Sequence, residues 1–351
     1  MTGMRCVFAR HTVLLALLTM ALATTARAQQ LPSGDGVNSP NQVNSPNQVN
    51  SPNQVNAPNQ VNAPNRAGAV AATNAPDGAE LVRHATVKIA QHSTIESRLR
   101  VRTDLMGQPL VGSGEYAQLN SSAGLLLRLE LSIQAGEQAT SVRQISDGRD
   151  LWEHWVIGDQ QRVNHIDLRR VERTVKALPK GTYVGGTSAN LAVGGLPKLV
   201  TQLSRTFDFG RAPVRSGQLG GIPVWFATGI WHGELLAKAA PQAVEDGKIV
   251  YEKLPVHLPH QVELVLGKND LFPYRVTYFR YQKIDLEHVL RPAVTTEFFD
   301  VVMDRQLNPA QFHYQTPKQL SFVDKTDAFM QAMGIPSNAT MATRPEVDRS
   351  R

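Results

Sequence analysis

The chain has 351 residues, a net charge of +6 and a single cysteine, Cys6. Its length leaves room for two domains, and its charge is only mildly basic, without the concentrated positive charge of a nucleic-acid-binding protein, so we expect no nucleic-acid partner. One cysteine excludes an internal disulfide, and a mature chain that has lost Cys6 would contain no thiolate nucleophile and no zinc–thiolate site.

Residues 1–28 have the pattern of a secretory signal. Arg5 and Arg10 give a positive start, residues 13–23 form an apolar run that is short for a bilayer span, and the tripeptide A-R-A ends at Ala28. Cys6 precedes the apolar run, whereas a lipid-acceptor cysteine would follow it. We therefore expect export with cleavage near Ala28; an uncleaved membrane anchor is the alternative.

A tandem repeat occupies residues 37–66, where five hexapeptides follow one another: VNSPNQ three times, then VNAPNQ and VNAPNR. Each repeat has one valine and one proline, and proline has no N–H for regular strand pairing. A six-residue period would also suit a stacked β-solenoid, but one valine per repeat offers such a solenoid little core. We interpret residues 29–76 as an extended, solvated linker.

The folded domain is expected over residues 77–334 and begins with a helix. Asp77 and Glu80 have the spacing of a capping box, and the helix would end near Ser93. The first strand, residues 95–106, follows.

That first strand carries arginine at every second position from Arg98 to Arg102. Such a row is typical of a solvated outer face. The alternative is a cationic rim that meets lipid head groups or an acidic partner.

The clearest strand pattern lies within residues 112–152. In the run LLLRLELSIQ, which starts at Leu125, every second residue is leucine or isoleucine, and polar residues fill the gaps after the second leucine. This period of two indicates a strand with one apolar face. A second strand at 141–145 runs into the dipeptide D-G at 147–148, a strong hairpin-turn signal, so the segment predicts an antiparallel meander.

Trp152 and Trp155 lie in the next expected strand, residues 151–157. Their spacing places them on opposite faces of the sheet. One of them can belong to the core; the other then needs a second cover or a ligand.

Two helices are expected next. The first follows Asp167, a candidate N-cap, and runs to residue 178, whereas residues 181–195 are glycine-rich, lack the phosphate-binding glycine motifs and predict a mobile loop. The second helix carries an apolar stripe formed by Leu196, Leu199, Val200 and Leu203. A helix packed on a sheet has such a stripe, and a lid over an apolar cavity would use the same one.

Further strands are expected at 222–230, 262–266, 274–281, 294–303 and 311–315, with a charged insertion at 234–260, a short helix at 324–333 and a flexible tail at 335–351. In the strands at 274–281 and 294–303 both faces carry bulky apolar residues. A sheet that is apolar on both sides needs helices on one face and something else on the other, and a bound apolar ligand often takes that place.

No catalytic, metal or cofactor motif stands out. His257 and His260 are flanked by prolines on an expected loop, without a carboxylate at ligand spacing, and no serine has a G-x-S-x-G context. We therefore expect a non-enzymatic protein without a cofactor; a hydrolase that uses an unrecognised site is the remaining alternative.

Three local motifs resemble a known family, the periplasmic outer-membrane lipoprotein-sorting carriers of the LolA type. The sequence GSGEY at 112–116 is similar to that family's Gly-x-Gly-acid-aromatic entry to an early strand. SDGRDLW at 146–152 is similar to its Ser-Asp-Gly-x-x-Leu-Trp turn, and FHYQTP at 312–317, followed by V-D at 323–324, is similar to its closing segment. The resemblance covers about residues 77–333.

The resemblance implies an α+β fold, mainly antiparallel: an unclosed half-barrel of about ten or eleven strands, with helices over its open side. It implies a periplasmic, monomeric carrier of acyl chains or lipidated protein that also meets envelope membrane proteins. A related class, the sensors of periplasmic stress, shares the fold, so a sensor or scaffold module that binds a protein partner is the alternative. The expected cavity residues are Leu127, Leu129, Leu131, Trp152, Trp155, Phe226, Tyr278 and Phe298, under a lid helix with Leu196, Leu199, Val200 and Leu203.

The chain departs from the family at one place. The carriers have an Arg-Pro pair just after the Gly-x-Gly strand, and that arginine helps to hold the lid, whereas this chain has N-S-S at 120–122. The resemblance therefore does not say how a lid would be held here.

Overall fold

The computed structural model describes residues 75–105, 108–122, 124–135, 138–178, 187–245, 248–255, 258–284, 287–333 and 335. The expected export signal, all five hexapeptide repeats and the expected tail after residue 335 lie outside this part of the chain. His257 and residues 181–186 of the glycine-rich segment lie outside it as well.

Thirteen strands form one sheet. In pairing order they are β15 (Phe322–Asp324), β6 (Gln160–Asp167), β5 (Asp150–Ile157), β4 (Gln138–Ser146), β3 (Gly124–Ala135), β2 (Gln108–Ser121), β1 (Thr94–Leu105), β14 (Glu287–Met303), β13 (Pro273–Ile284), β12 (Gln261–Gly267), β9 (Ile222–Trp231) and β7 (Phe207–Asp208), with β8 (Arg215–Leu219) paired to β9. Every pair is antiparallel except β15 with β6. The first and last strands of this order do not pair with each other, so the sheet is open, as expected.

The expected number of ten or eleven strands was wrong. The extra strands are short: β7 has two residues, β15 three and β8 five. Segments of this length are too short to show a period of two, and pairing with a longer neighbour holds them in place.

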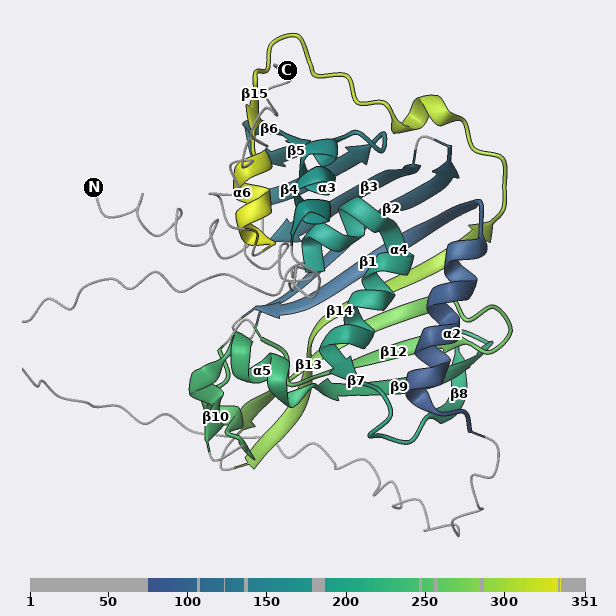
Figure 1. The fold of residues 1–351 in the computed structure, drawn as a ribbon, viewed down its shortest axis with the longest axis vertical. Coiled ribbons are helices and arrows are strands. Elements are labelled where there is room, and N and C mark those ends of the chain that lie inside the picture. Colours follow the sequence, from purple (N-terminus) through teal and green to yellow (C-terminus); the bar gives the residue numbers. More distant parts are fainter. Residues whose placement is uncertain are drawn as a thin grey trace, which may run out of the picture. The chain divides into compact units, whose positions relative to one another are not determined.

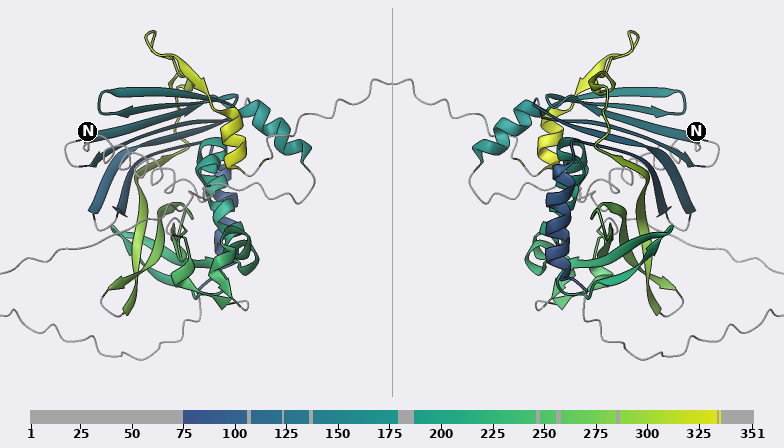
Figure 2. Two further views of the ribbon diagram at one scale, coloured as in Figure 1. Left: turned by 90° about the vertical axis from the view of Figure 1, so that its left-hand side faces the viewer. Right: turned by 90° about the vertical axis from the view of Figure 1, so that its right-hand side faces the viewer.

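Helices cover one side of this sheet. They are α2 (Gly78–Gln91), α3 (Leu168–Ala177), α4 (Thr187–Thr206), α5 (Gly233–Ala239) and α6 (Thr326–Ala332). Figure 1 shows α2 and α4 crossing the strands, and Figure 2 shows both helices on the inside of the curve of the sheet. We call this side the inner face and the opposite side the outer face. None of the helices in the described ranges is long and apolar enough to cross a membrane.

Two of the expected helix starts are confirmed by their caps. The Asp77 carboxylate accepts the Glu80 N–H at 2.9 Å at the start of α2, and the Asp167 carboxylate accepts the Arg170 N–H at 2.8 Å at the start of α3. A side-chain acceptor at this position satisfies one of the free N–H groups of the first helical turn. The reciprocal half of the capping box is not formed at α2, where the Glu80 carboxylate accepts from Arg83 instead.

The charged insertion between β9 and β12 folds into small elements. After α5 it contains the short helix η1 (Pro241–Ala243), the two-stranded ribbon of β10 (Val244–Glu245) and β11 (Lys248–Ile249), and the short helix η2 (Tyr251–Lys253).

The segment expected as a strand at 311–315 is not one. Asn308 instead accepts the Ala310 N–H at 3.0 Å and starts the short helix η3 (Pro309–Phe312). Phe312 is buried on the outer face against Ala117 and Leu126. The chain between β14 and β15 therefore covers part of the outer face, which supplies the second cover that a sheet with two apolar faces requires.

The glycine-rich segment was also predicted wrongly in part. Residues from Thr187 onward are helical and belong to α4, which is interrupted only at Gly195. Glycine lowers helix propensity, but contact with the sheet and with α2 outweighs that loss here.

Candidate functional site

The buried layer between α4 and the inner face is the candidate site. The apolar stripe of α4 lies within the largest buried cluster, in which Leu196, Val200 and Leu203 are 0% exposed and Leu199 is 7% exposed. Strands from both halves of the sheet contribute to the same cluster. The stripe therefore packs on the sheet, as either interpretation of the sequence required.

The structure brings six of the eight predicted cavity residues together under the helices: Leu127, Leu129, Leu131, Trp155, Tyr278 and Phe298. They come from β3, β5, β13 and β14, and the pairing of the strands places them on the same face of the sheet. Leu131, for example, pairs with Val142 of β4, and Val142 pairs with Trp155 of β5.

Trp152 and Phe226 lie on the outer face instead. Trp152 stacks on Tyr314 with a ring distance of 5.4 Å, so the chain after β14 is its second cover. Phe226 lies under the guanidinium groups of Arg215 and Arg275, at 5.4 and 5.8 Å. The sequence predicted that the two tryptophans face opposite ways but could not say which one faces the helices.

The Gly-x-Gly motif allows β2 and β3 to approach each other closely. A Cβ atom on Gly114 would lie 1.8 Å from the Glu130 carbonyl oxygen, so no residue larger than glycine fits at this position. Two residues further along the same face of β2, Tyr116 points inward and is 1% exposed, and its ring meets Phe298 edge-on at 6.1 Å.

Tyr116 and Gln118 hold α4 at its break. Gly195 has a φ of 61°, in the left-handed region, and the next residue, Leu196, donates its N–H to the Tyr116 hydroxyl at 3.2 Å and to Gln118 Oε1 at 3.4 Å. The Tyr116 O–H in turn donates to Gln118 Oε1 at 2.5 Å. We call Tyr116, Gln118 and Leu196, which these hydrogen bonds join, the α4 tie.

The α4 tie is fully enclosed. Burial raises the pKa of the Tyr116 hydroxyl well above its ordinary value, so the hydroxyl stays a donor at every pH at which the fold persists. A Cβ on Gly195 would lie 2.6 Å from Gln118 Oε1, so the break needs glycine for space as well as for its φ. This contact was not predicted from the sequence. The only local indication in the sequence is that Tyr116 and Gln118, which follow Gly114 at every second position, place two polar groups on a strand face that is otherwise apolar.

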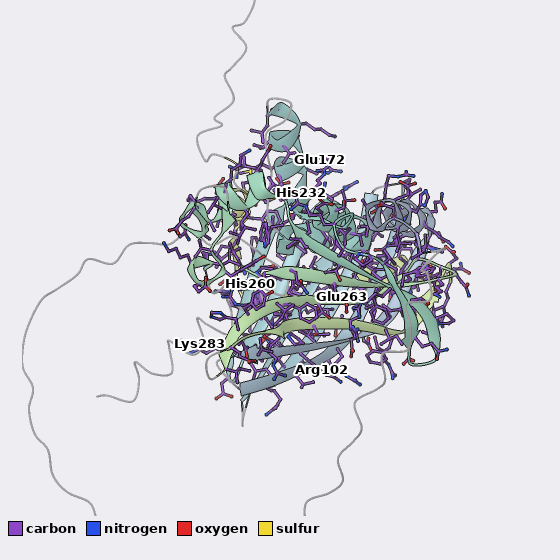
Figure 3. All side chains as sticks on the ribbon, turned by 90° about the horizontal axis from the view of Figure 1, so that it is seen from below. Arg102, Glu172, His232, His260, Glu263 and Lys283 are labelled. Atoms are coloured by element: carbon purple, nitrogen blue, oxygen red, sulfur yellow. The ribbon has the colours of Figure 1, made fainter. Side chains whose placement is uncertain are left out.

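The row of arginines on β1 is the solvated outer face that the first interpretation predicted. Arg98 lies 3.5 Å from Asp300, and Arg100 lies over the Phe299 ring at 5.5 Å. Figure 3 labels Arg102 of β1 and Glu263 of β12, which belong to the same sheet.

A depression of about 260 Å³ lies on the outer face over β2 to β5. Its side chains include Ser113, Glu115, Glu130, Ser132 and Arg143. Arg143 is ion-paired with Glu130 at 2.7 Å. The sheet itself separates this depression from the apolar layer under α4.

One serine, one histidine and one aspartate meet where α2 joins β1, but not as a catalytic triad. The Ser93 hydroxyl donates to Asp304 Oδ1 at 3.0 Å, and His92 Nδ1 contacts Oδ2 of the same carboxylate at 2.8 Å. In a triad the serine hydroxyl donates to the histidine. Within the described ranges no three His, Cys, Asp or Glu side chains are grouped so that they could hold a metal ion.

His260 is buried just before the start of β12 and is neutral. The Tyr281 N–H donates to His260 Nδ1 at 3.3 Å, and His260 Nε2 therefore carries the proton that faces the Tyr251 carbonyl at 3.3 Å. Burial, aided by the charge of Arg280, lowers the pKa of His260 to about 4. His260 therefore has a structural role, and the expectation that it is a surface residue of a loop was wrong, since it is 5% exposed.

No protein-family model matches the chain, and no curated protein matches it. Solved structures do. One is a putative outer membrane lipoprotein-sorting protein domain from Vibrio parahaemolyticus, with 11% identity over 68% of this chain and 97% of that chain, at a TM-score of 0.28. Another is lipoprotein LppX of Mycobacterium tuberculosis, with 11% identity over 66% and 97%, at a TM-score of 0.34. A third is MucB, with 10% identity over 68% of this chain and 63% of that chain, at a TM-score of 0.32.

A lipoprotein-sorting domain, the kind of protein that the sequence motifs resemble, is thus among the solved structures to which the chain is similar. At these identities and TM-scores the likeness carries no argument about what this chain binds.

Proposed function

We propose that the protein is an exported, non-enzymatic binding protein that holds an acyl chain, of a lipid or of a lipidated protein, between the inner face of its sheet and α4. The expected signal at residues 1–28 supports export. The cover formed by α4 carries the rest of the proposal.

The supporting observation is that α4 covers an apolar face as a separate, interrupted element. Its backbone leaves the helical conformation at Gly195, and Pro197 follows two residues later. Proline has no N–H, so the helix is already short of regular hydrogen bonds at this point. The α4 tie fixes the break to β2 through side chains. A helix that covers the sheet with an apolar stripe can exchange that packing for an acyl chain.

The free energy of packing the α4 stripe on the sheet is comparable with that of packing a long acyl chain in its place. Exposing four aliphatic side chains costs about 1.5–3 kcal/mol each, or about 6–12 kcal/mol for the α4 stripe. Each buried methylene of a ligand returns about 0.8 kcal/mol, so a chain of about 14 methylenes returns roughly 11 kcal/mol. Long acyl chains can therefore replace α4 on the sheet, whereas chains of about eight carbons cannot. No specific polar contact is needed for this selection.

Native mass spectrometry of the purified mature protein tests the proposal. We expect co-purified lipid in the spectrum and, after delipidation, binding of palmitate but not of octanoate. Folded protein that binds neither would overturn the proposal.

A protein-binding module is the second candidate, supported by one edge of the sheet. β15 is the terminal strand of the pairing order in the described part of the chain, and its Phe322 and Val323 side chains are 51% and 45% exposed. An exposed edge strand can pair with a strand of a partner. Lys325 donates its N–H to the His165 carbonyl of β6, so the N–H groups of residues 323 and 325 face β6 and that of Phe322 faces the open edge. Phe322→Pro would therefore abolish pairing of this kind, and this substitution should leave acyl binding intact.

A further inference from the structure

A polar group of three side chains lies on the inner face at the β4–β6 end of the sheet. The Glu153 carboxylate accepts from Gln144 Nε2 at 2.8 Å and from Asn164 Nδ2 at 3.1 Å. Gln144 and Asn164 are buried. Because an ionised carboxylate only accepts hydrogen bonds, both amides must turn their NH₂ groups toward Glu153. This fixes the Asn164 carbonyl oxygen on the side away from Glu153.

That carbonyl oxygen and a neighbouring indole are both without a partner in the part of the chain that the structure describes. They are Asn164 Oδ1 and Trp155 Nε1, and both residues are more than nine-tenths buried. Trp155 pairs with Arg162 and Glu153 pairs with Asn164, so Trp155 and Asn164 are diagonal neighbours on one face. A buried N–H donor and a buried C=O acceptor therefore belong to diagonal neighbours on one face, and leaving both unpaired is unfavourable.

This pair borders the apolar layer under α4. Trp155 belongs to the same buried cluster as the α4 stripe, and it is joined to Leu131 through Val142 across β4. A ligand that enters between α4 and the sheet would meet apolar side chains along most of its length and the Trp155–Asn164 pair at one end.

We infer that Trp155 and Asn164 bind the polar head of the acyl ligand, and that this head is neutral and both donates and accepts a hydrogen bond. This inference rests on the proposed function. The Trp155 N–H would donate to a carbonyl or hydroxyl oxygen of the head, and Asn164 Oδ1 would accept from a hydroxyl or amide. The Glu153 carboxylate next to Asn164 disfavours an anionic head. A monoacylglycerol or an N-acyl amide has this chemistry; a free fatty acid does not.

Three ligands with the same acyl chain test the inference on the delipidated mature protein: 1-palmitoylglycerol, methyl palmitate and palmitate. We expect the glycerol ester to bind about 10-fold more tightly than the methyl ester, because only the former can donate to Asn164. We also expect it to bind more tightly than palmitate.

Two substitutions separate the two contacts. Trp155→Phe should weaken binding of both esters, by about 5- to 10-fold, because each has an oxygen that can accept from the indole. Asn164→Leu should weaken binding of the glycerol ester alone. Trp152→Phe, on the outer face, is the matched control and should change neither.

The results for the three ligands can show separately whether the polar-head site is wrong and whether acyl binding itself is wrong. Equal affinities for the two esters, or tightest binding of palmitate through the exposed Arg162, would overturn the polar-head site while leaving acyl binding in place. Failure of folded wild-type protein to bind any of the three would overturn the acyl-binding proposal itself. The comparison of ligands on the wild-type protein needs no variant, so a variant that does not fold leaves the test intact.

Discussion

Tyr116→Phe tests how α4 is held. The substitution removes only the hydroxyl, which donates to Gln118 Oε1 at 2.5 Å and accepts from the Leu196 N–H at 3.2 Å. The ring keeps its buried position, and the Leu196 N–H keeps Gln118 Oε1 at 3.4 Å as a weaker partner. The change therefore acts on the α4 tie and leaves the apolar layer unchanged.

The loss of these contacts should lower the free energy of unfolding by about 1–2.5 kcal/mol, since each buried hydrogen bond contributes about 1 kcal/mol and partial rescue by Gln118 limits the penalty for Leu196. For a domain of this size that corresponds to a fall in Tm of about 2–10 °C, measured by circular dichroism or calorimetry. Tyr274→Phe is the matched control. The Tyr274 hydroxyl is half-buried and donates to Asp270 at 2.7 Å, outside the α4 tie, so we expect a smaller fall.

The same substitution should change ligand binding in the opposite direction. If α4 must lift before an acyl chain binds, destabilising the closed state by about 1–2 kcal/mol raises the apparent affinity by roughly 5- to 30-fold. Palmitate titration of the delipidated protein measures this. A variant that is less stable and binds palmitate no better than the wild type would refute the idea that α4 is the moving cover.

Three further substitutions test the packing around the site. Gly195→Ala should lower the free energy of unfolding by about 2–4 kcal/mol, because alanine is strained at this φ and its Cβ would press on Gln118; urea denaturation with an unchanged m-value checks this, and no change would contradict the tight break. Glu263→Gln should lower the free energy of unfolding by about 1–3 kcal/mol, because it removes a carboxylate charge that is only 10% exposed and lies 2.7 Å from the Arg215 guanidinium. Arg215 itself is largely solvated, which limits the loss. An unchanged free energy of unfolding would mean that this ion pair does not stabilise the fold. His260 has a folded-state pKa of about 4 and an unfolded value near 6.5, so the unfolded chain binds the extra proton and stability falls as the pH drops from about 6.5 to 4. In His260→Asn this part of the pH dependence should disappear, and unfolding curves of the two proteins that stay parallel across that range would contradict the assignment.

Local patterns in the sequence predicted the strands, turns and caps well, because these depend on neighbours along the chain. The alternation after Leu125 marks β3, and Asp77 and Asp167 cap the helices that they were expected to cap. The turn before β5 has Asp147 Oδ1 accepting the N–H groups of Arg149 and Asp150, both at 2.9 Å, as its Asp-Gly sequence suggests.

The face that each strand turns toward the helices could not be predicted. A period of two separates residues into two sets without assigning either set to a side. Trp152 and Phe226 were therefore grouped with residues from which the sheet separates them. Which side α4 covers depends on packing between segments that are distant in the sequence.

The α4 tie was beyond sequence reasoning for the same cause. Leu196 meets Tyr116 across 80 positions, and no spacing rule links a strand residue with a helix break at that distance. The structure places the contact within the Gly-x-Gly strand, on Tyr116 and Gln118, which follow Gly114 on the same face.

The most direct test of acyl binding under α4 is photo-crosslinking. A palmitoyl ligand that carries a diazirine near the end of its chain is bound to the delipidated mature protein, irradiated and mapped at residue level by mass spectrometry. Binding under α4 predicts crosslinks to inner-face residues such as Leu129 and Phe298, or to Leu199 of α4, and none to Phe226 on the outer face. Saturable binding with crosslinks confined to the outer face would contradict it.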